Sequence, residues 1–477
     1  MAEGQVAAWE RGRRVSQQAP AGAGRRAWLL AWLAYLPVAV MRAGTLAESD
    51  TFWQIRAGLV TIDHRAIPRV DTFSWTVYGK PWTLNSWGFN VLIAGAYRLA
   101  GLPGAAWACA GLVMAAAAMV LLLARQLGAS PFLAGALLVL TSPLLIGWLS
   151  ARPQLVDYVA IPALVMLLRR IAAGRDQARS VAAVGLLTVA WVNLHAASLF
   201  GVAIAGASAL LLLARRSTRA GGLWCGGAAA AALAGSLLNP YGAGVFTQTA
   251  QVQSASAGVV TEWQHINPAS PTEWLIVVLG AAALIVAIRR RDRVLISALA
   301  ITAPGAVLAI RLLPILGLVA VPALAAAGSH PLVIRYVRSR RFMLTLGAAA
   351  IESVFLTLAG MNLTHIGRPL AAYYPDRAVR AIPRGCRVFN SYLVGGYVIL
   401  ERPGVKVSLD SRNDLYGPKR VIAEQEVVRR GGNTVTALAG AGCVLVPAHS
   451  ALATQLYQNP GWQVRAREAA AVLFVRD

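Results

Sequence analysis

The sequence predicts an α-helical integral membrane protein with about eleven transmembrane helices and a small C-terminal extracytoplasmic α/β domain. Of its 477 residues, 57% are hydrophobic and only 13% are charged, whereas soluble domains contain about 25% charged residues. Long apolar runs fill the chain up to residue 361, and short β-branched runs separated by Gly, Pro and Asn follow from residue 362. This pattern excludes an ordinary soluble protein.

Eleven apolar segments are long enough to cross a bilayer, which takes roughly 20 residues of helix. They lie at about 27–44, 103–124, 131–149, 155–170, 180–196, 199–214, 220–238, 272–289, 294–310, 312–328 and 342–361. The stretch 85–100 is shorter and carries several polar side chains, so we interpret it as interfacial or re-entrant. The predicted parts are a cytoplasmic segment at 1–26, a membrane domain at 27–361 with a long first outer loop at 45–102, and an extracytoplasmic domain at 362–477.

The basic residues decide the orientation and the number of spans. The chain has 44 Lys and Arg against 20 Asp and Glu, a net charge of +24, and cytoplasmic loops of membrane proteins carry the excess of Lys and Arg. Eleven spans with a cytoplasmic N-terminus place the arginine clusters at 169–179 and 289–293 inside, whereas a twelfth span would place them outside. The outer loop 239–272 contains no Lys or Arg. We therefore predict eleven spans in the inner (plasma) membrane of a bacterium, and no nucleic-acid partner.

The last 116 residues, 362–477, alternate between short β-branched runs and helix-like stretches, which predicts a small α/β domain. Strands are predicted at 387–390, 397–400, 405–409, 443–447 and 471–475, and helices at 418–430 and 450–458. Because an odd number of spans puts this domain outside, Cys386 and Cys443 could form a disulfide if their strands are neighbours. Two separate buried thiols are the alternative. No Cys or His spacing matches a zinc or iron–sulfur site.

Polar chemistry gathers on the predicted outer side. Within the span region this side holds seven of the acidic residues, at positions Glu48, Asp50, Asp63, Asp71, Asp157, Glu262 and Glu273, whereas Asp176 and Asp292 lie inside. Arg152 and Arg311 are lone arginines between apolar spans, where a charge is costly unless it is paired or used. Asp63 and Asp71 are predicted as caps or turn formers.

The chain has an acid pair directly after the first span, a long first outer loop, about a dozen helices and a C-terminal outer domain. In these features it resembles the GT-C class of integral-membrane glycosyltransferases, which includes protein O-mannosyltransferases and aminoarabinose transferases. Six motifs can be quoted: Asp50–Gly58, Ile67–Thr76, Trp191–His195, Phe389–Tyr392, Gly395–Tyr397 and Leu409–Gly417. In these motifs the chain resembles, more closely, a bacterial multi-pass group described as glycosyltransferase-like. Two positions depart from that group, which has His-Glu where this chain has Asn85-Ser86 and Gly where it has Ala196.

The resemblance implies transfer of a sugar from a polyprenyl-phosphate donor to a glycan, lipid or protein acceptor of the cell envelope, on the outer face and with inversion. Asp50, or else Glu48, would take the acceptor's proton, and Arg311 and Arg152 would hold the donor phosphate. Four further side chains would orient the sugar or acceptor: Asn193, His195, Glu262 and His265. Asp410, Arg412, Asp414 and Tyr416 are candidates in the outer domain, and a polar turn is the alternative for this segment.

Three questions stay open at this point. No cofactor is certain, but a divalent cation, Mg²⁺ or Mn²⁺, on Glu48 and Asp50 would need Glu262 or His265 as further ligands. A transporter or flippase for a lipid-linked solute is an alternative function, although such proteins usually carry ionisable residues near mid-membrane. A non-catalytic envelope protein descended from a transferase is the third reading.

Overall fold

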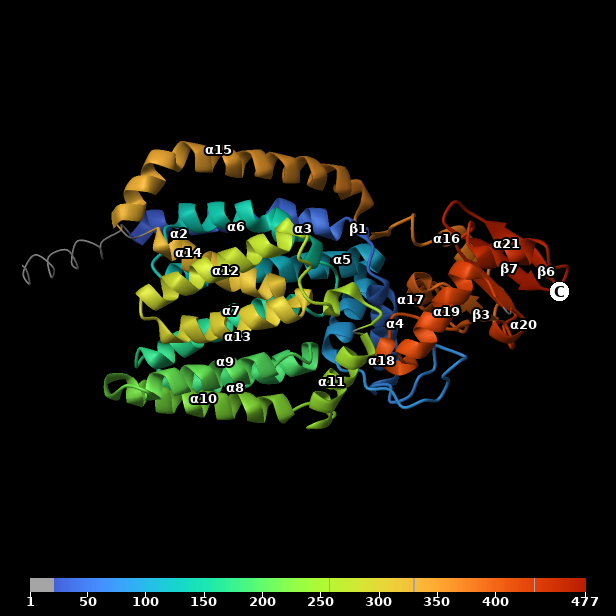
Figure 1. The fold of residues 1–477 in the computed structure, drawn as a ribbon, viewed down its shortest axis with the longest axis horizontal. Coiled ribbons are helices and arrows are strands. Elements are labelled where there is room, and N and C mark those ends of the chain that lie inside the picture. The colour runs from blue at the N-terminus through green and yellow to red at the C-terminus, as the bar shows by residue number, and fades with distance from the viewer. Residues whose placement is uncertain (1–20, 257, 329–330, 433) are drawn as a thin grey trace, which may run out of the picture.

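The fold is a bundle of roughly parallel helices joined to a C-terminal part built on a β-sheet (Figure 1). The computed structural model describes residues 21–256, 258–328, 331–432 and 434–477. Most of the predicted N-terminal segment 1–26 lies outside these residues.

A helix covers each of the eleven segments expected to span the membrane. They are α2 (Ala21–Leu33) followed by α3 (Leu36–Ala43), α5 (Trp87–Gln126), α6 (Pro131–Leu145), α7 (Leu155–Ala172), α8 (Gln177–Leu194), α9 (Leu199–Leu213), α10 (Arg219–Leu237), α12 (Pro271–Arg289), α13 (Arg293–Leu308), α14 (Leu313–Ala327) and α15 (Pro331–Asn362). Among the described residues, six helices are long and apolar enough to cross a membrane. The chain is therefore a multi-pass membrane protein, and the count of eleven crossings stays a prediction.

Helix α14 forms the centre of the bundle and α15 its periphery. In the most apolar stretch of α14, 78% of the sequence is buried inside the protein. In the corresponding stretch of α15 the buried share is only 11%. Figure 1 shows α15 along the outer edge of the bundle. The apolar surface of α15 is thus left for lipid rather than for the protein core.

Helix α5 is kinked, because Ala100 and Gly101 have non-helical backbone angles and Pro103 follows. Gly101 has φ of 63°, which favours glycine. The stretch 85–100, expected to be interfacial or re-entrant, thus forms the first arm of α5 at 87–99, before the kink. This arm packs against α4 (Ser49–His64).

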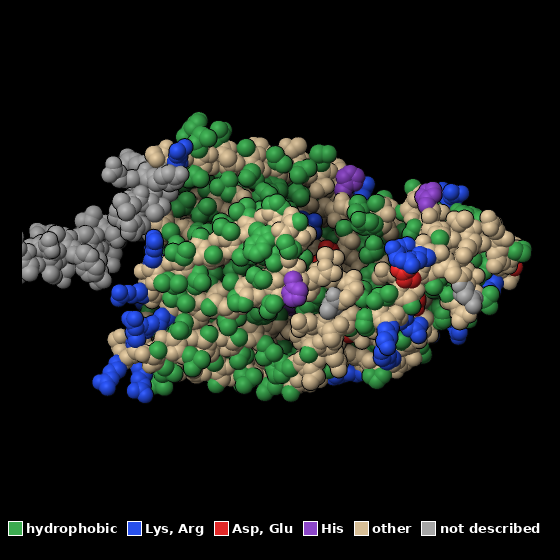
Figure 2. Space-filling view, in the orientation of Figure 1, with side chains coloured by type: hydrophobic (Ala, Val, Ile, Leu, Met, Phe, Trp, Pro, Cys, Tyr) green, Lys and Arg blue, Asp and Glu red, His purple; other side chains and the backbone are tan. Residues whose placement is uncertain are grey.

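The charges are divided between the two ends of the bundle. Figure 2 shows apolar side chains over its middle and Lys and Arg at the end farthest from the sheet. The loops after α7, α9 and α12 lie at this end and carry exposed arginines, among them Arg175, Arg216 and Arg291. The acidic residues of the predicted outer side belong to other segments: some lie in α4 or in the first turns of α7 and α12, and the rest in loops.

The first loop is anchored where α4 begins. The short strand β1 (Thr45–Leu46) pairs in parallel with β2 (Arg368–Pro369), and the Tyr374 hydroxyl donates a hydrogen bond of 2.8 Å to the Ala47 carbonyl. Both contacts fix the chain directly before Glu48. The first turn of α4 therefore has a defined position at the junction of bundle and sheet.

The C-terminal part is a five-stranded mixed sheet of order β4-β3-β5-β7-β6. β3 (Arg387–Asn390) is parallel to β4 (Lys406–Val407) and β5 (Cys443–Val446), while β7 (Val472–Arg476) is antiparallel to β5 and β6 (Trp462–Arg467). The predicted helices are present as α19 (Pro418–Arg430) and α21 (Ala451–Tyr457). Shorter helices are α16 (Asp376–Arg380), α18 (Asn413–Tyr416) and α20 (Thr434–Ala437).

In the five-stranded sheet, one predicted strand is wrong and one strand was not predicted; the short strands β1 and β2 were not predicted either. The segment 397–400 belongs to helix α17 (Gly395–Glu401), whose residues 395–400 are all buried. A fully buried run has no alternation, so period alone does not separate strand from helix. Strand β6 was missed although its residues alternate between apolar and polar, because it carries a single β-branched residue, Val464, and four of its six side chains are exposed.

Cys386, just before β3, and Cys443, at the start of β5, form a disulfide with a Cα–Cα distance of 6.3 Å. Of the two pairing alternatives the structure has the bonded one. Cys109 and Cys225 are free and buried.

Candidate functional site

The site is built around the first turn of α4. Glu48 has extended backbone angles at the N-cap position, and Asp50 lies in the first turn, where a negative charge is favoured by the helix dipole. Asp50 Oδ1 accepts hydrogen bonds from Trp53 Nε1 (3.2 Å) and from the Ser411 hydroxyl (2.5 Å). A residue of the C-terminal part thus helps to orient the carboxylate at the end of the bundle.

Arg152 joins three carboxylates that come from two distant segments. Its Nη1 donates to Glu262 Oε1 (2.5 Å) and its Nη2 to Asp50 Oδ2 (3.3 Å), and Glu48 Oε2 lies 3.8 Å from Nη1. The Arg152 side chain is 16% exposed. Since three carboxylates meet one guanidinium, the cluster has an excess of negative charge when all are ionised.

The pKa of Glu48 is raised. The largest cause is burial, which disfavours the carboxylate, and Asp50 and Glu262 add to it, while Arg152 acts in the opposite direction. Burial also lowers the pKa of Arg152, but the three carboxylates more than offset this and the net shift is upward. Arg152 therefore stays charged, and Glu48 takes up a proton more readily than an exposed glutamate.

These residues line a polar cavity of about 390 Å³ between the bundle and the C-terminal part. Among the described residues, two oxygens of its lining side chains are buried without a hydrogen-bond partner, Gln54 Oε1 and Glu262 Oε2. A buried oxygen without a partner costs free energy. Both atoms are therefore suited to accept hydrogen bonds from a polar ligand.

An apolar cavity of about 330 Å³ adjoins the polar one. Its apolar lining includes Leu199, Phe200, Leu308, Leu312 and Ile315. The two cavities share six lining residues: Asn85, Gln154, His195, Val252, Trp263 and Arg311. The polar cavity and the apolar cavity thus meet at one boundary.

Arg311 lies at this boundary. Its guanidinium carbon is 4.0 Å from the centre of the Trp263 ring, a cation–π distance. Within the described part of the chain it has no hydrogen bond and no ion pair. In contrast to Arg152, the donors of Arg311 are available to an anionic ligand.

His195 also lies at the boundary and is held by Asp157. His195 Nδ1 is 2.8 Å from Asp157 Oδ1, which accepts a second hydrogen bond from Trp191 Nε1 (2.7 Å). Asp157 is 3% exposed. The sequence placed Asp157 on the outer side but indicated no role for it, because its partners come from the next helix.

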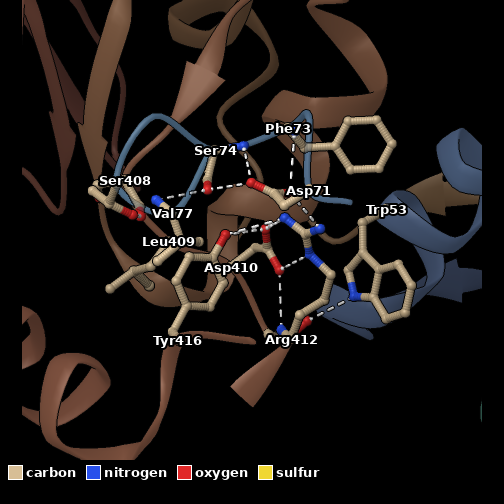
Figure 3. Close-up of polar contacts among 12 residues, drawn as sticks. Trp53, Asp71, Phe73, Ser74, Val77, Ser408, Leu409, Asp410, Arg412 and Tyr416 are labelled. Carbon is tan, nitrogen blue, oxygen red and sulfur yellow. Dashed lines mark hydrogen bonds and ion pairs between the residues drawn. The ribbon is translucent and has the colours of Figure 1, made fainter. Parts of the chain in front are cut away.

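The outer-domain candidates form a buried ion cluster (Figure 3). Arg412 donates to both oxygens of Asp410 (2.8 and 2.6 Å) and to Asp71 Oδ1 (2.7 Å), and the Tyr416 hydroxyl donates to Asp410 Oδ2 (2.7 Å). Arg412 is 2% exposed, and Asp410 and Asp71 are fully buried. The cluster joins the C-terminal part to the first loop, so these side chains hold the walls of the cavity in place.

Asp71 combines the predicted turn role with an unpredicted ion pair. Its carboxylate accepts hydrogen bonds from the backbone N–H of Phe73 and of Ser74, and from the Ser74 hydroxyl. Asp414, the fourth outer candidate, lines the polar cavity and accepts a hydrogen bond of 2.6 Å from Gln248 in α11 (Gly244–Ser256). Burial raises the pKa of Asp414.

Of the twelve site residues predicted from the sequence, eight line the polar cavity, Asp410 and Tyr416 lie in the ion cluster beside it, and Asn193 and His265 lie apart. Glu48, Asp50, Arg152, His195, Glu262, Arg311, Arg412 and Asp414 all line the polar cavity. Asn193 instead accepts from Trp87 Nε1 (2.9 Å) and donates to the carbonyls of Val189 and Leu238, so its polar atoms are used within the protein. His265 is exposed and lines neither cavity.

The divalent cation considered for Glu48 and Asp50 gains no support from the structure and stays untested. In the described part of the chain, no group of three or more His, Cys, Asp or Glu side chains is arranged to hold a metal ion. One oxygen of Asp50 and one of Glu262 contact Arg152, and His265 lines neither cavity.

No protein-family model and no curated protein matches the chain. Solved structures do match it. The oligosaccharyltransferase of Archaeoglobus fulgidus in the apo form aligns with a TM-score of 0.56 and 12% identity over 89% of this chain and 69% of that one. ArnT of Cupriavidus metallidurans bound to undecaprenyl phosphate aligns with a TM-score of 0.55 and 13% identity over 96% and 98%. Both are GT-C glycosyltransferases, and this chain shares their fold.

Proposed function

We propose that this chain, with its GT-C fold, is a membrane glycosyltransferase that moves a sugar from a polyprenyl-phosphate donor to a cell-envelope acceptor. The observation that supports this best is the boundary between the two cavities. A donor of this class has a long apolar chain, one phosphate and a polar sugar. The protein offers matching sites in the same order: the apolar cavity for the chain, Arg311 for the phosphate and the polar cavity for the sugar.

In this proposal Asp50 is the general base. The acceptor hydroxyl gives its proton to the Asp50 carboxylate while its oxygen attacks the anomeric carbon, and the bond from that carbon to the phosphate oxygen breaks. The sugar is transferred with inversion, and the polyprenyl phosphate leaves with both bonding electrons. Glu48 stands next to Asp50 as the second carboxylate and the alternative base.

The two arginines take different roles. Arg311 binds the leaving phosphate, since guanidinium donors match phosphate oxygens and stay charged. Arg152, predicted from the sequence as a second phosphate ligand, is better suited to serve as the counter-ion that holds Asp50, Glu48 and Glu262 together. The apolar cavity beside Leu308 and Ile315 would receive the first isoprene units. ArnT, one of the proteins that share the fold, has been solved with undecaprenyl phosphate.

We further propose that the cavity opens on the outer face of the inner membrane and that residues 362–477 form an extracytoplasmic domain. The Cys386–Cys443 disulfide supports this, because disulfides persist in oxidising compartments. So does the gathering of arginines at the opposite end of the bundle.

A deletion strain tests the function. Loss of the gene should remove one glycan or glycolipid of the envelope, and wild-type protein should restore it. Asp50→Asn and Arg311→Ala should each fail to restore it although both proteins reach the membrane, whereas the exposed Arg430→Ala should restore it fully. Full restoration by both site variants would overturn the proposed function.

A further inference from the structure

Asp157 is a buried carboxylate that the proposed reaction does not use. It lies in the first turn of α7, and a single oxygen, Oδ1, accepts from both Trp191 and His195. Trp191 is 1% exposed and His195 directly follows the last residue of α8. Asp157 thus fixes the end of α8 and the imidazole beyond it.

This contact determines which nitrogen of His195 faces the cavities. An ionised carboxylate can only accept hydrogen bonds, so the His195 nitrogen that contacts Asp157, Nδ1, carries the hydrogen. Nε2 lies on the other side of the ring, and the residue lines both the polar and the apolar cavity. Arg311 and Trp263 line the same boundary.

We infer that Asp157 is a positioning residue that aims His195 Nε2 at the phosphate of the lipid donor, so that His195 and Arg311 bind this phosphate together. In its protonated form His195 donates from Nε2, and Asp157 supplies the counter-charge that an imidazolium needs at a partly buried position. The two donors reach the phosphate from separate elements, His195 from the end of α8 and Arg311 from the turn before α14. This inference rests on the proposed function.

Binding of undecaprenyl phosphate to the full-length protein in nanodiscs tests the inference. A hydrogen bond to a charged group contributes about 1.5–3 kcal/mol, so we expect His195→Ala to weaken binding by about tenfold to a hundredfold. Asp157→Asn should weaken it by about tenfold, because the amide keeps the accepting oxygen but not the negative charge that balances the His195 imidazolium. Adding Asp157→Asn to His195→Ala should have no further effect, and His195→Gln, whose amide can donate from the same place, should recover most of the affinity.

Two controls separate this role from a structural one. Asp157→Asn keeps an oxygen that accepts from Trp191, so it should fold. Asn193→Ala removes hydrogen bonds from the same helix end and should lower the unfolding temperature while changing affinity less than twofold. An equal loss of affinity in Asn193→Ala and Asp157→Asn would contradict the inference, as would equal affinities of His195→Gln and His195→Ala. The latter comparison stands even if Asp157→Asn does not fold.

The result also distinguishes this inference from the function on which it rests. If wild-type protein binds undecaprenyl phosphate and Arg311→Ala does not, but Asp157→Asn and His195→Ala bind normally, the inference alone is wrong. If wild-type protein does not bind the lipid, the proposed function itself fails.

Discussion

Arg152 and Arg311 show how far single residues can be interpreted from sequence. Both are isolated arginines between apolar segments, and the sequence predicts the same phosphate-binding role for both. In the structure three carboxylates surround Arg152, whereas Arg311 contacts the face of Trp263. The sequence indicates that a charge needs a partner, but the partner of Arg152 at shortest distance is 110 positions away.

The raised pKa of Glu48 leads to a pH prediction. A carboxyl group with a raised pKa takes up its proton at higher pH, so activity should fall as pH drops through that pKa and the cluster loses its negative charge. Glu262→Gln removes one carboxylate that raises this pKa. The acidic limb of the profile of kcat/KM against pH should therefore move to lower pH.

Sugar transfer in membrane vesicles over a series of pH values measures this shift. Glu273→Gln is the matched control, because Glu273 accepts a hydrogen bond from the Asn267 backbone and is not part of the cluster. A limb that stays in place or moves to higher pH in Glu262→Gln would contradict the assigned electrostatics.

The Arg412 cluster predicts a large effect on stability. Arg412→Met leaves Asp410 and Asp71 buried without their counter-ion, and removing one partner of a buried ion pair costs about 3–5 kcal/mol. Tyr416→Phe, which removes one hydroxyl, should cost about 1 kcal/mol. The exposed Arg429→Met should cost less than about 0.5 kcal/mol. Thermal unfolding in detergent gives the order, and equal midpoints for the first and third variants would count against a structural role of the cluster.

Among the elements, helices were predictable and the sheet only in part. Apolar runs of about 20 residues locate the bundle helices, since lipid-facing and buried faces are both apolar and the signal continues along the whole segment. Segment 397–400 was assigned to a strand because its fully buried residues show no period. The exposed edge strand β6 alternates between apolar and polar residues, but with one β-branched residue it does not stand out as a β-branched run.

The packing of α4 on α5 predicts a difference between two glycines. A Cβ at Gly58 would lie 2.0 Å from the Asn90 carbonyl oxygen, whereas a Cβ at Gly95 in α5 would meet nothing within 4 Å. Gly58→Ala must therefore push α4 away from α5, with a cost of about 1–3 kcal/mol, and it should reduce transfer because α4 carries Asp50. Gly95→Ala should be neutral or stabilising by up to about 1 kcal/mol.

Unfolding midpoints and transfer rates of the two alanine variants provide the comparison. If Gly58→Ala is as stable and as active as Gly95→Ala, the close contact between α4 and α5 does not position Asp50.

At the scale of the whole molecule, the distribution of scarce charges predicted the site better than any motif did. Counting arginines on each side of the eleven segments assigned the acids to one face, and six of the predicted residues of the span region line one cavity. The division into two cavities could not be foreseen, because it depends on how α9, α13 and α14 lie beside the segment 258–270. The role of Asp71 could not be foreseen either, because its ion-pair partner, Arg412, lies 341 positions away in the sequence.

The orientation can be measured directly. A single cysteine at the exposed position Arg430, in a chain that keeps its disulfide, should react with a membrane-impermeant maleimide in intact spheroplasts. A cysteine at the exposed position Arg216 should react only after the membrane is opened. The reverse pattern would overturn the predicted sidedness of both ends of the bundle.

The proposed donor site is tested most directly by an experimental structure of the protein in nanodiscs that contain undecaprenyl phosphate. We predict density for the phosphate within hydrogen-bond distance of Arg311, with the first isoprene units in the apolar cavity beside Leu308 and Ile315 and with Asp50 across the polar cavity. A phosphate bound elsewhere, or lipid that leaves the boundary between the two cavities empty, would contradict it.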